Sequence, residues 1–196
     1  IKVSKQTLSK NSNITFLNES IDNVSIKKNS QDFGYSLGVL HHIPDTQRAL
    51  NNCVSLLKQD APFLVYLYYN FDNRPTFFKL IWMCSEFFRS LISKLPNSIK
   101  PLLTDSIAIF VYWPFSRFSK LISYFGINPS FMPLSFYRDS SFYTLRTDSR
   151  DRFGTPLEQR FSKKDILNMM NKAGLNRVKF SDEEPYWVAV GFKSVQ

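Results

Sequence analysis

Cysteine, histidine and glycine are scarce in this chain of 196 residues. It holds two cysteines, two histidines and six glycines. Two cysteines cannot build a disulfide framework, and so few Cys and His side chains give no zinc-binding spacing. Cys53 and Cys84 lie in apolar segments with helical spacing, which is typical of reduced core thiols. We therefore expect a cytoplasmic protein without a bound metal.

The sequence also lacks long apolar runs and long basic runs. No uncharged segment offers the roughly 20 apolar residues that span a bilayer, and no signal-peptide pattern is present. No run of Lys or Arg exceeds two residues, so there is no basic tail for nucleic acid. The formal net charge of +9 indicates either acidic partners or a solvated basic surface. A hydrophobic content of 43% is typical of a globular protein with a core.

The first third of the chain alternates between strand and helix signals. The pattern predicts short strands at residues 14–17 and 32–40, and a third strand at residues 63–69. The near-continuous apolar character of residues 32–40 favours a strand in a sheet covered on both faces. Asp45 or Thr46 can begin a helix that runs to about Lys58.

The middle of the chain departs from this alternation. Apolar residues at steps of four and three predict an amphipathic helix that ends at Pro96. These residues are Phe77, Ile81, Cys84, Phe88, Leu91 and Leu95. An apolar stripe of this kind more often packs in a core than lines a pocket. Further helices are expected at residues 99–112 and 115–125. Residues 127–160 are predicted to form an extended, aromatic-rich loop.

The last 36 residues return to regular structure. Ser162 and Asp165 have the spacing of a capping box, and Gly174 is a helix stop. Two strands, at residues 175–180 and 186–192, are expected to form an antiparallel hairpin.

Two motifs carry a family resemblance. The segment Asp-Phe-x-x-Ser-x-Gly-Val-Leu-His-His-Ile-Pro-Asp at residues 32–45 is followed by Leu-Leu-Lys-x-x-Ala-Pro and a strand. Together they resemble the fourth and fifth strands of class I S-adenosylmethionine-dependent methyltransferases. The segment from Phe161 to Leu175 is similar to their last helix and terminal hairpin.

The resemblance implies an α/β fold with a Rossmann-like sheet that is incomplete, containing strands 3 to 7. It divides the chain into a partial cofactor-binding core at residues 1–69, a substrate-covering insertion at 70–160, and a C-terminal helix and hairpin at 161–196. The family's acidic Gly-x-Gly cofactor loop is absent, because no Gly-x-Gly occurs in the chain. We therefore expect a fragment of a longer protein, inactive alone.

S-adenosylmethionine is the cofactor that the resemblance implies. By this resemblance Glu19, Ser20 and Ile21 follow the third strand and lie near adenine. Leu37, Gly38 and Val39 lie at the end of the fourth strand, near the rest of the cofactor. His41 and His42 follow as candidates for a base or for orienting an acceptor. A helix-capping or packing role for either histidine stays open.

The insertion is aromatic and basic. Residues 70–160 contain 19 of the 31 aromatic residues, and 12 Lys or Arg against 7 Asp or Glu. In this family such a segment covers the acceptor, which implies a small-molecule, lipid-like or carrier-linked glycan acceptor. The candidate substrate residues are Tyr68, Tyr69, Arg138, Arg146 and Arg152. Packing of the tyrosines, and Arg–Asp pairs that fix a loop, are the alternatives.

A second function class stays open beside the enzyme. Aromatic and basic residues interleave on the helices expected within residues 70–130, which favours a membrane-surface or partner-binding module and a peripheral membrane contact. Methylation of nucleic acid is disfavoured, because Leu-His-His-Ile stands where a base-flipping enzyme carries an Asn-Pro-Pro-Tyr-type motif. The sequence does not define the oligomeric state.

Overall fold

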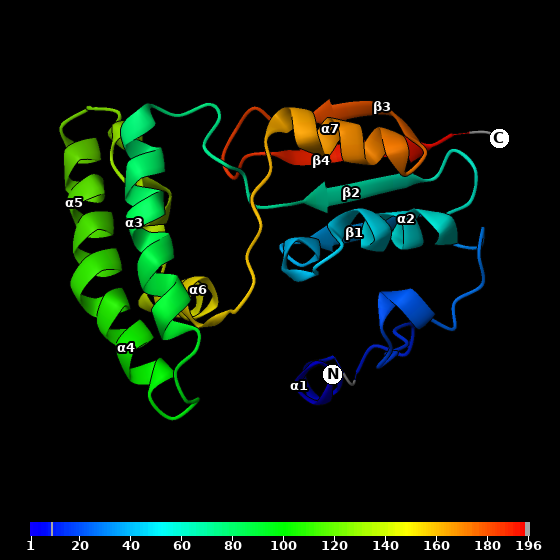
Figure 1. Cartoon of the computed structure of the whole chain (residues 1–196), viewed down its shortest axis with the longest axis horizontal. Coiled ribbons are helices and arrows are strands. Elements are labelled where there is room, and N and C mark those ends of the chain that lie inside the picture. Colours follow the sequence, from blue (N-terminus) through cyan, green and yellow to red (C-terminus); the bar gives the residue numbers. More distant parts are fainter. Residues whose placement is uncertain (9, 195–196) are drawn as a thin grey trace. The chain divides into compact units, whose positions relative to one another are not determined.

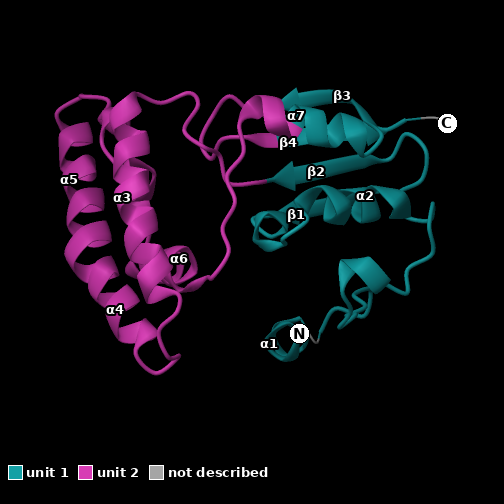
Figure 2. Ribbon diagram, viewed as in Figure 1, with its two compact units in different colours: residues 1–66, 167–180, 189–196 teal, residues 67–166, 181–188 magenta. Residues whose placement is uncertain are grey.

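The computed structural model describes residues 1–8 and 10–194, which form two compact units (Figure 2). Unit 1 comprises residues 1–66, 167–180 and 189–196. Unit 2 comprises residues 67–166 and 181–188. The chain thus leaves unit 1 after its second strand and returns to it through its last helix.

Unit 1 is built on a four-stranded mixed sheet (Figure 1). Its strands lie in the order β1 (Gly34–Leu37), β2 (Pro62–Tyr66), β4 (Val188–Lys193) and β3 (Leu175–Phe180). β1 and β2 are parallel, and β3 and β4 form the expected antiparallel hairpin. A parallel pair needs a crossover connection, which helix α2 (Thr46–Leu56) supplies.

Two helices cover one face of this sheet. Helix α2 buries Ala49, Leu50 and Val54, and helix α7 (Lys163–Lys172) buries Ile166 and Met170. The Gln47 side chain donates to the Met169 carbonyl at 3.1 Å, which links the two helices.

Both helix starts follow from their sequence. The Asp45 carboxylate accepts from the Arg48 N–H at 2.9 Å, and the Asp165 N–H donates to the Ser162 hydroxyl at 3.1 Å. The Ser162 N–H in turn donates to the Asp165 carboxylate at 3.0 Å, so the capping box is confirmed.

Two expectations for unit 1 were wrong: a strand at residues 14–17, and a first strand covered on both faces. Residues 14–17 form no strand, and the described N-terminal segment contributes only helix α1 (Lys2–Thr7) and the 3₁₀ turn η1 (Ile21–Asn23). β1 pairs with β2 alone and is an edge strand.

β1 is also covered on one face only, since Tyr35 is 66% and Leu37 49% exposed. The covering helices pack on the face that carries Phe63 and Val65, and side chains alternate between faces along a strand.

Unit 2 is helical. Its helices are α3 (Thr76–Ile92), α4 (Lys100–Ile107), the π-helical turn η3 (Ala108–Tyr112), α5 (Trp113–Tyr124) and α6 (Phe142–Gly154). Two 3₁₀ turns, η4 (Pro129–Phe131) and η5 (Ser135–Asp139), precede α6. α4, η3 and α5 follow one another without an intervening loop (Figure 1). A core of Ile92, Tyr112, Leu145 and Phe153 lies among these helices.

Helix α6 corrects the expected loop at residues 127–160. Its sequence carries no apolar stripe, so periodicity did not indicate a helix. Its start is capped by Ser141, whose hydroxyl accepts from the Thr144 N–H at 3.2 Å. Arg150 makes two bonds of 2.7 Å to the Asp105 carboxylate of α4. The cap and the ion pair to α4 therefore stabilise a helix that the spacing of its apolar residues does not predict.

The apolar stripe of α3 does not form the core, contrary to expectation. Phe77, Ile81, Phe88 and Leu91 are exposed, as is Cys84, and the buried residues of α3 are Phe78, Arg89 and Ile92. Among the described residues, no helix is both long and apolar enough to cross a bilayer.

Substitution of Gly34 should show how tightly unit 1 is packed. A Cβ at Gly34 would lie 2.9 Å from Cδ2 of Phe63 and 3.2 Å from Cδ2 of Leu57. We expect Gly34→Ala to destabilise β1 by about 1–3 kcal/mol, measured by hydrogen exchange of the β1 and β2 amides. Gly154→Ala is the control, because nothing lies within 4 Å of its Cβ position. Equal protection in both variants would contradict the packing of β1 on Leu57 and Phe63.

Candidate functional site

The carboxyl ends of β1 and β2 meet at one edge of the sheet. Gly38 follows β1 with a φ of +69°, and its N–H donates to the Tyr66 carbonyl at 3.0 Å. A side chain at this φ is strained, which explains the glycine. An added Cβ would meet only Tyr66 Cδ1, at 4.0 Å, so the space above Gly38 is open. Leu37 and Val39, on either side, are half exposed.

The two histidines differ sharply in environment. They belong to the 3₁₀ turn η2 (Leu40–His42), directly after the Gly38 turn. His41 is completely buried, whereas His42 is only partly buried. Their rings lie 4.1 Å apart. Of the pair, His42 is therefore the more accessible residue, although its Nε2 atom is buried.

Residues 19–21 make a locally closed loop. The Glu19 carboxylate accepts from the Ser25 N–H at 2.6 Å and from the Ser25 hydroxyl at 2.8 Å. Both bonds lower the pKa of Glu19, and the bond from the Ser25 backbone N–H has the larger effect. The Ser20 hydroxyl accepts from the Asp22 N–H at 3.3 Å. Glu19 and Ser20 thus hold the loop, and only Ile21 has no such polar task.

Helix α2 supports both candidate cofactor segments. Asp22 of η1 accepts from Arg48 and from Asn52, each at 2.9 Å. The Thr46 hydroxyl lies 3.2 Å from the carbonyls of Leu40 and of Ile43, at the two ends of η2. One helix therefore positions the loop after residue 18 and the histidine turn. Asp22 is a positioning residue that the sequence pattern did not reveal.

The described residues fit part of an S-adenosylmethionine site. The open space over Gly38 and the apolar side chains of Leu37 and Val39 suit a flat organic group at this edge of the sheet. The exposed Glu19 carboxylate accepts one hydrogen bond from Ser25 on each oxygen and keeps further acceptor capacity. No group of three or more metal-ligating side chains occurs in the described part of the chain. Burial raises the pKa of Cys53 to about 11, so this thiol is unreactive.

A hollow of about 690 Å³ in unit 1 is more polar than the sheet edge at Gly38. It is lined by several polar and basic residues, among them Lys28, Lys58 and Lys193. The Lys193 ammonium donates to the Leu57 carbonyl at 2.8 Å, at the end of α2, and burial lowers its pKa. A cation at a helix C-terminus is a stabilising contact. We assign Lys193 a structural role.

The interior of unit 2 is charged. Arg152 donates to the Glu158 carboxylate at 2.8 Å and to Glu86 at 3.1 Å. Glu86 also pairs with Arg89, which lowers the pKa of Glu86 and raises that of Arg89. The Arg89 guanidinium donates to the carbonyls of Thr155 and Pro156. These contacts define an ionic network that joins α3, α6 and the segment after α6.

Arg160 extends this network among aromatic rings. It bonds to Glu158 at 2.8 Å and to the Tyr69 carbonyl at 3.1 Å. Its guanidinium also lies 5.0–5.8 Å from the centres of the Tyr68, Phe71 and Trp82 rings. The network therefore combines stacking with charge pairing, which suits arginine better than lysine.

Three buried polar atoms of unit 2 have no hydrogen-bond partner among the described residues. They are Trp82 Nε1, Glu158 Oε2 and Asn70 Oδ1. The Glu158 side chain is 0% exposed. Native proteins leave few such atoms, and each calls for a bound water or ligand.

Tyrosines and aspartates of unit 2 form a second polar group. The Tyr68 hydroxyl donates to Asp151 at 2.8 Å. Burial, with a smaller effect of Asp151, raises the pKa of Asp148, while a hydrogen bond with Tyr137 opposes this rise. Burial likewise raises the pKa of Tyr137 and of Tyr112. These phenols stay protonated and can donate.

The five candidate substrate residues do not converge. Tyr68, Tyr69 and Arg152 take part in the polar groups described above. Arg138 pairs with its neighbour Asp139 at 3.4 Å, and Arg146 lies 5.9 Å from the exposed Tyr143 ring. Arg152 is 10% exposed and is bound to Glu86 and Glu158, whereas the alternative expected an Arg–Asp pair in a loop. The partners Glu86, Glu158 and Arg160 were missed, because isolated charges in a sequence do not reveal their pairing.

Comparisons with known proteins agree with the class of fold. Residues 1–65 match the family described as methyltransferase domain. This segment ends within β2 and contains the Gly38 turn and both histidines. The resemblance to class I methyltransferases is confirmed for it. A search of the curated proteins found none that matches the chain.

Solved structures share the fold at low identity. An O-methyltransferase family protein from Burkholderia thailandensis has a TM-score of 0.51 and 10% identity, covering 98% of this chain and 40% of its own. A SAM-dependent methyltransferase from Methanosarcina mazei has a TM-score of 0.45 and 10% identity, covering 91% and 66%. The chain spans 51% of a similar protein from Bacillus halodurans. The likeness to the Burkholderia structure shows that the described sheet and helices have an α/β, Rossmann-like fold.

Removal of Arg152 should destabilise unit 2 strongly. Arg152→Ala leaves Glu158 with one charge partner in a buried position, which costs about 3–5 kcal/mol. Hydrogen exchange of the α6 amides measures this loss locally. Arg146→Ala is the control in the same helix and should change stability by less than about 0.5 kcal/mol. Equal effects would contradict a structural role specific to Arg152.

Neutralising Asp148 should stabilise unit 2 at neutral pH. Its folded pKa is raised, so the ionised carboxylate costs folding free energy above that pKa and nothing once it is protonated. Asp148→Asn should therefore raise the melting temperature at pH 7, with the gain vanishing below about pH 4. Asp182→Asn, at a largely exposed carboxylate, is the control. A gain that persists at low pH would contradict the assignment.

Proposed function

We propose that the protein transfers a methyl group from S-adenosylmethionine to a small-molecule, lipid-like or carrier-linked glycan acceptor. One observation carries this proposal: the segment that matches the methyltransferase domain contains the open Gly38 turn and the His42 turn at the carboxyl ends of β1 and β2. Ligands of open parallel sheets bind at this kind of edge.

The cofactor, when bound, supplies a methyl group already activated by a sulfonium. What remains for the protein is alignment, exclusion of water and removal of a proton from the acceptor. Leu37 and Val39 offer half-exposed apolar contact on either side of Gly38. Residues 19–21 contribute a loop that Glu19 and Asp22 hold in place.

His42 is the proposed base. It is partly buried, whereas His41 is fully buried and packs against it. A neutral imidazole accepts a proton from an acceptor hydroxyl or amine near physiological pH. His41 is assigned to positioning, because its ring supports that of His42.

The acceptor-binding residues are proposed to lie in unit 2. Trp82 Nε1 can donate, and Glu158 Oε2 and Asn70 Oδ1 can accept, beside the aromatic rings that surround Arg160. A hydroxyl group both accepts and donates, so it would satisfy these atoms. This chemistry supports an acceptor with hydroxyl groups and an apolar or ring portion.

Substitution of Gly38 should weaken cofactor binding. A β-branched side chain at positive φ is strained, so Gly38→Val should distort the turn and weaken S-adenosylhomocysteine binding by about tenfold or more. Asn tolerates this conformation, and Gly38→Asn should bind more tightly than Gly38→Val. Calorimetry on the full-length protein measures both. Equal binding by wild type and Gly38→Val would overturn the assignment of this edge.

Methyl-labelled S-adenosylmethionine then identifies the class of acceptor. Cell extract is incubated with and without the protein, and unreacted S-adenosylmethionine is removed by chromatography. The products are partitioned between chloroform and water, and the label that depends on the protein is counted in each phase. A lipid-like or carrier-linked acceptor takes the label into the organic phase, and a polar small molecule keeps it in water. Label in neither phase, with the cofactor bound, would contradict transfer to all of these acceptors.

A further inference from the structure

Besides the apolar core of unit 2, its helices carry many large apolar residues on the outside. Along α3 the exposed side chains form a stripe with helical spacing: Phe77, Leu80, Ile81, Cys84, Phe87, Phe88 and Leu91. The opposite side of the same helix buries Phe78, Arg89 and Ile92. Beside them Ser85 and Glu86 bond to Arg152, so only part of the inward side is apolar. A helix packed on a water-exposed bundle has the reverse arrangement.

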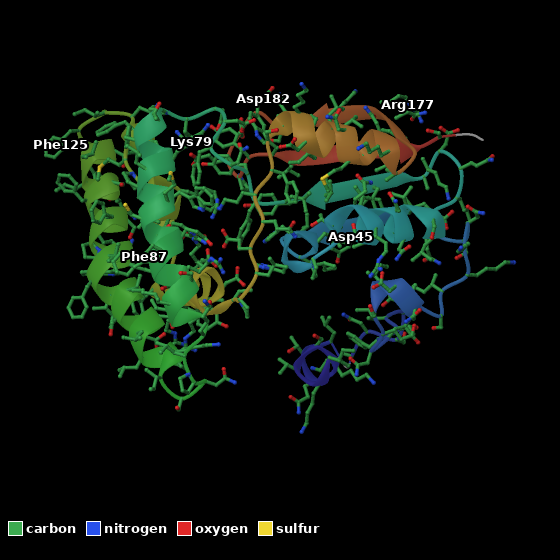
Figure 3. All side chains as sticks on the ribbon, in the orientation of Figure 1. Asp45, Lys79, Phe87, Phe125, Arg177 and Asp182 are labelled. Carbon is green, nitrogen blue, oxygen red and sulfur yellow. The ribbon has the colours of Figure 1, made fainter. Side chains whose placement is uncertain are left out.

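η3 and α5 repeat this inversion. Their buried residues include Ala108, Tyr112, Ser116 and Ser119. Their exposed apolar residues are larger and more numerous: Ile109, Phe110, Val111, Trp113, Phe115, Phe118 and Leu121. Phe110 is 76% and Phe87 62% exposed. Figure 3 labels Phe87 on α3 and Phe125 just after α5. An exposed apolar surface of this extent is unusual for a monomer in water.

Small hydroxyl residues fill the contacts between the helices instead. Those that are at least nine-tenths buried are Ser93, Thr104, Ser116, Ser119, Ser135 and Ser149. The Ser149 hydroxyl of α6 donates to the Thr104 carbonyl of α4 at 2.7 Å. Helix contacts rich in small residues, with the large apolar side chains outside, are typical of helices that pack in a membrane.

Hydroxyl groups on these helices bond to carbonyls of their own helix. Ser85 donates to Trp82, Ser90 to Phe87, and Ser116 to Trp113, at 2.7–2.9 Å. Ser106 and Ser123 do the same. Such bonds satisfy a hydroxyl without water, which is what an apolar medium requires.

The charge of this helical segment is positive. Residues 76–127 contain six basic and two acidic side chains. Both acids are held by arginines: Glu86 by Arg89 and Arg152, and Asp105 by Arg150. Lys79 on α3 and Lys94 after it are exposed. Long basic side chains beside apolar residues extend to phosphate groups while their stems stay in the apolar layer.

We propose that the exposed apolar residues of α3, η3 and α5 insert into the interface of an anionic lipid bilayer. The positive charge selects this occupant, because two copies of the same positive surface repel each other, whereas anionic lipid attracts it. No described helix can cross the bilayer, so these helices lie in its surface. The exposed Trp113 and Tyr124 suit the headgroup region.

Vesicle flotation tests this docking, and it requires no methyl transfer. The whole chain should float with phosphatidylcholine vesicles that contain phosphatidylglycerol and much less with phosphatidylcholine alone. Raising the salt from 0.1 to 0.5 M should weaken binding. The double variant Phe87→Ser/Phe110→Ser should bind at least about tenfold more weakly. Phe33→Ser, at a half-exposed phenylalanine of unit 1, is the matched control and should bind like wild type.

Trp113 reports insertion directly. Brominated lipids should quench the fluorescence of the wild type, and Trp113→Phe should remove most of that quenching. Circular dichroism confirms that each variant stays folded. Flotation that is absent, or equal in the double variant and the wild type, would overturn the proposal. So would a dimer in sedimentation velocity that the double variant abolishes, if the wild type also fails to bind vesicles, because a second copy would then cover this surface.

Discussion

The buried charge network around Glu158 is the constraint on which unit 2 depends. A carboxylate removed from water must be paired, and Arg152 and Arg160 each contact it at 2.8 Å. Glu158 lies in the segment after α6 and Arg152 lies in α6. Arg152 also forms an ion pair with Glu86 of α3. The interior therefore holds ion pairs and small hydroxyls beside the apolar core of Ile92, Leu145 and Phe153. Large apolar side chains on α3 and α5 are left on the outside.

This interior also explains why α6 exists at all. Its sequence has no apolar face, and a free segment of this composition would not be a stable helix. Ser141 caps its start, Arg150 fixes it to α4, and Arg152 ties it to α3 and Glu158. The same contacts place Tyr68 beside Asp151. A polar, aromatic environment for an acceptor thus arises from the groups that hold the helices together.

Unit 1 depends on one helix in a comparable way. α2 provides the crossover that makes β1 and β2 parallel, and its first two turns hold η1 through Asp22 and η2 through Thr46. The carboxyl edge of the sheet, the Gly38 turn and the histidines are therefore fixed by the same element. Cofactor chemistry at this edge and lipid contact through unit 2 would together suit an acceptor that resides in a membrane.

Local chemistry made much of the fold predictable from sequence. The caps at Asp45 and Ser162, the stop at Gly174 and the order of strands and helices follow from short-range bonds and periodicity. The Gly38 turn and the two histidines could be found because they follow an apolar strand. Residues 14–17 show the limit: a strand needs a neighbour to receive its hydrogen bonds, and the sheet offers none to this segment.

Only the tertiary structure decided which face of each helix is inside and which charges meet. The stripe of α3 has ideal spacing for a core, yet periodicity gives a direction only relative to the helix itself. Glu86, Arg152, Glu158 and Arg160 are far apart in sequence, and their pairing depends on how the helices pack. The sequence alone determined the parallel half-sheet and the turn at its carboxyl edge, because those rest on local bonds. The buried ion pairs and the apolar exterior of unit 2 depend on contacts between residues far apart in the sequence, which single residues do not encode.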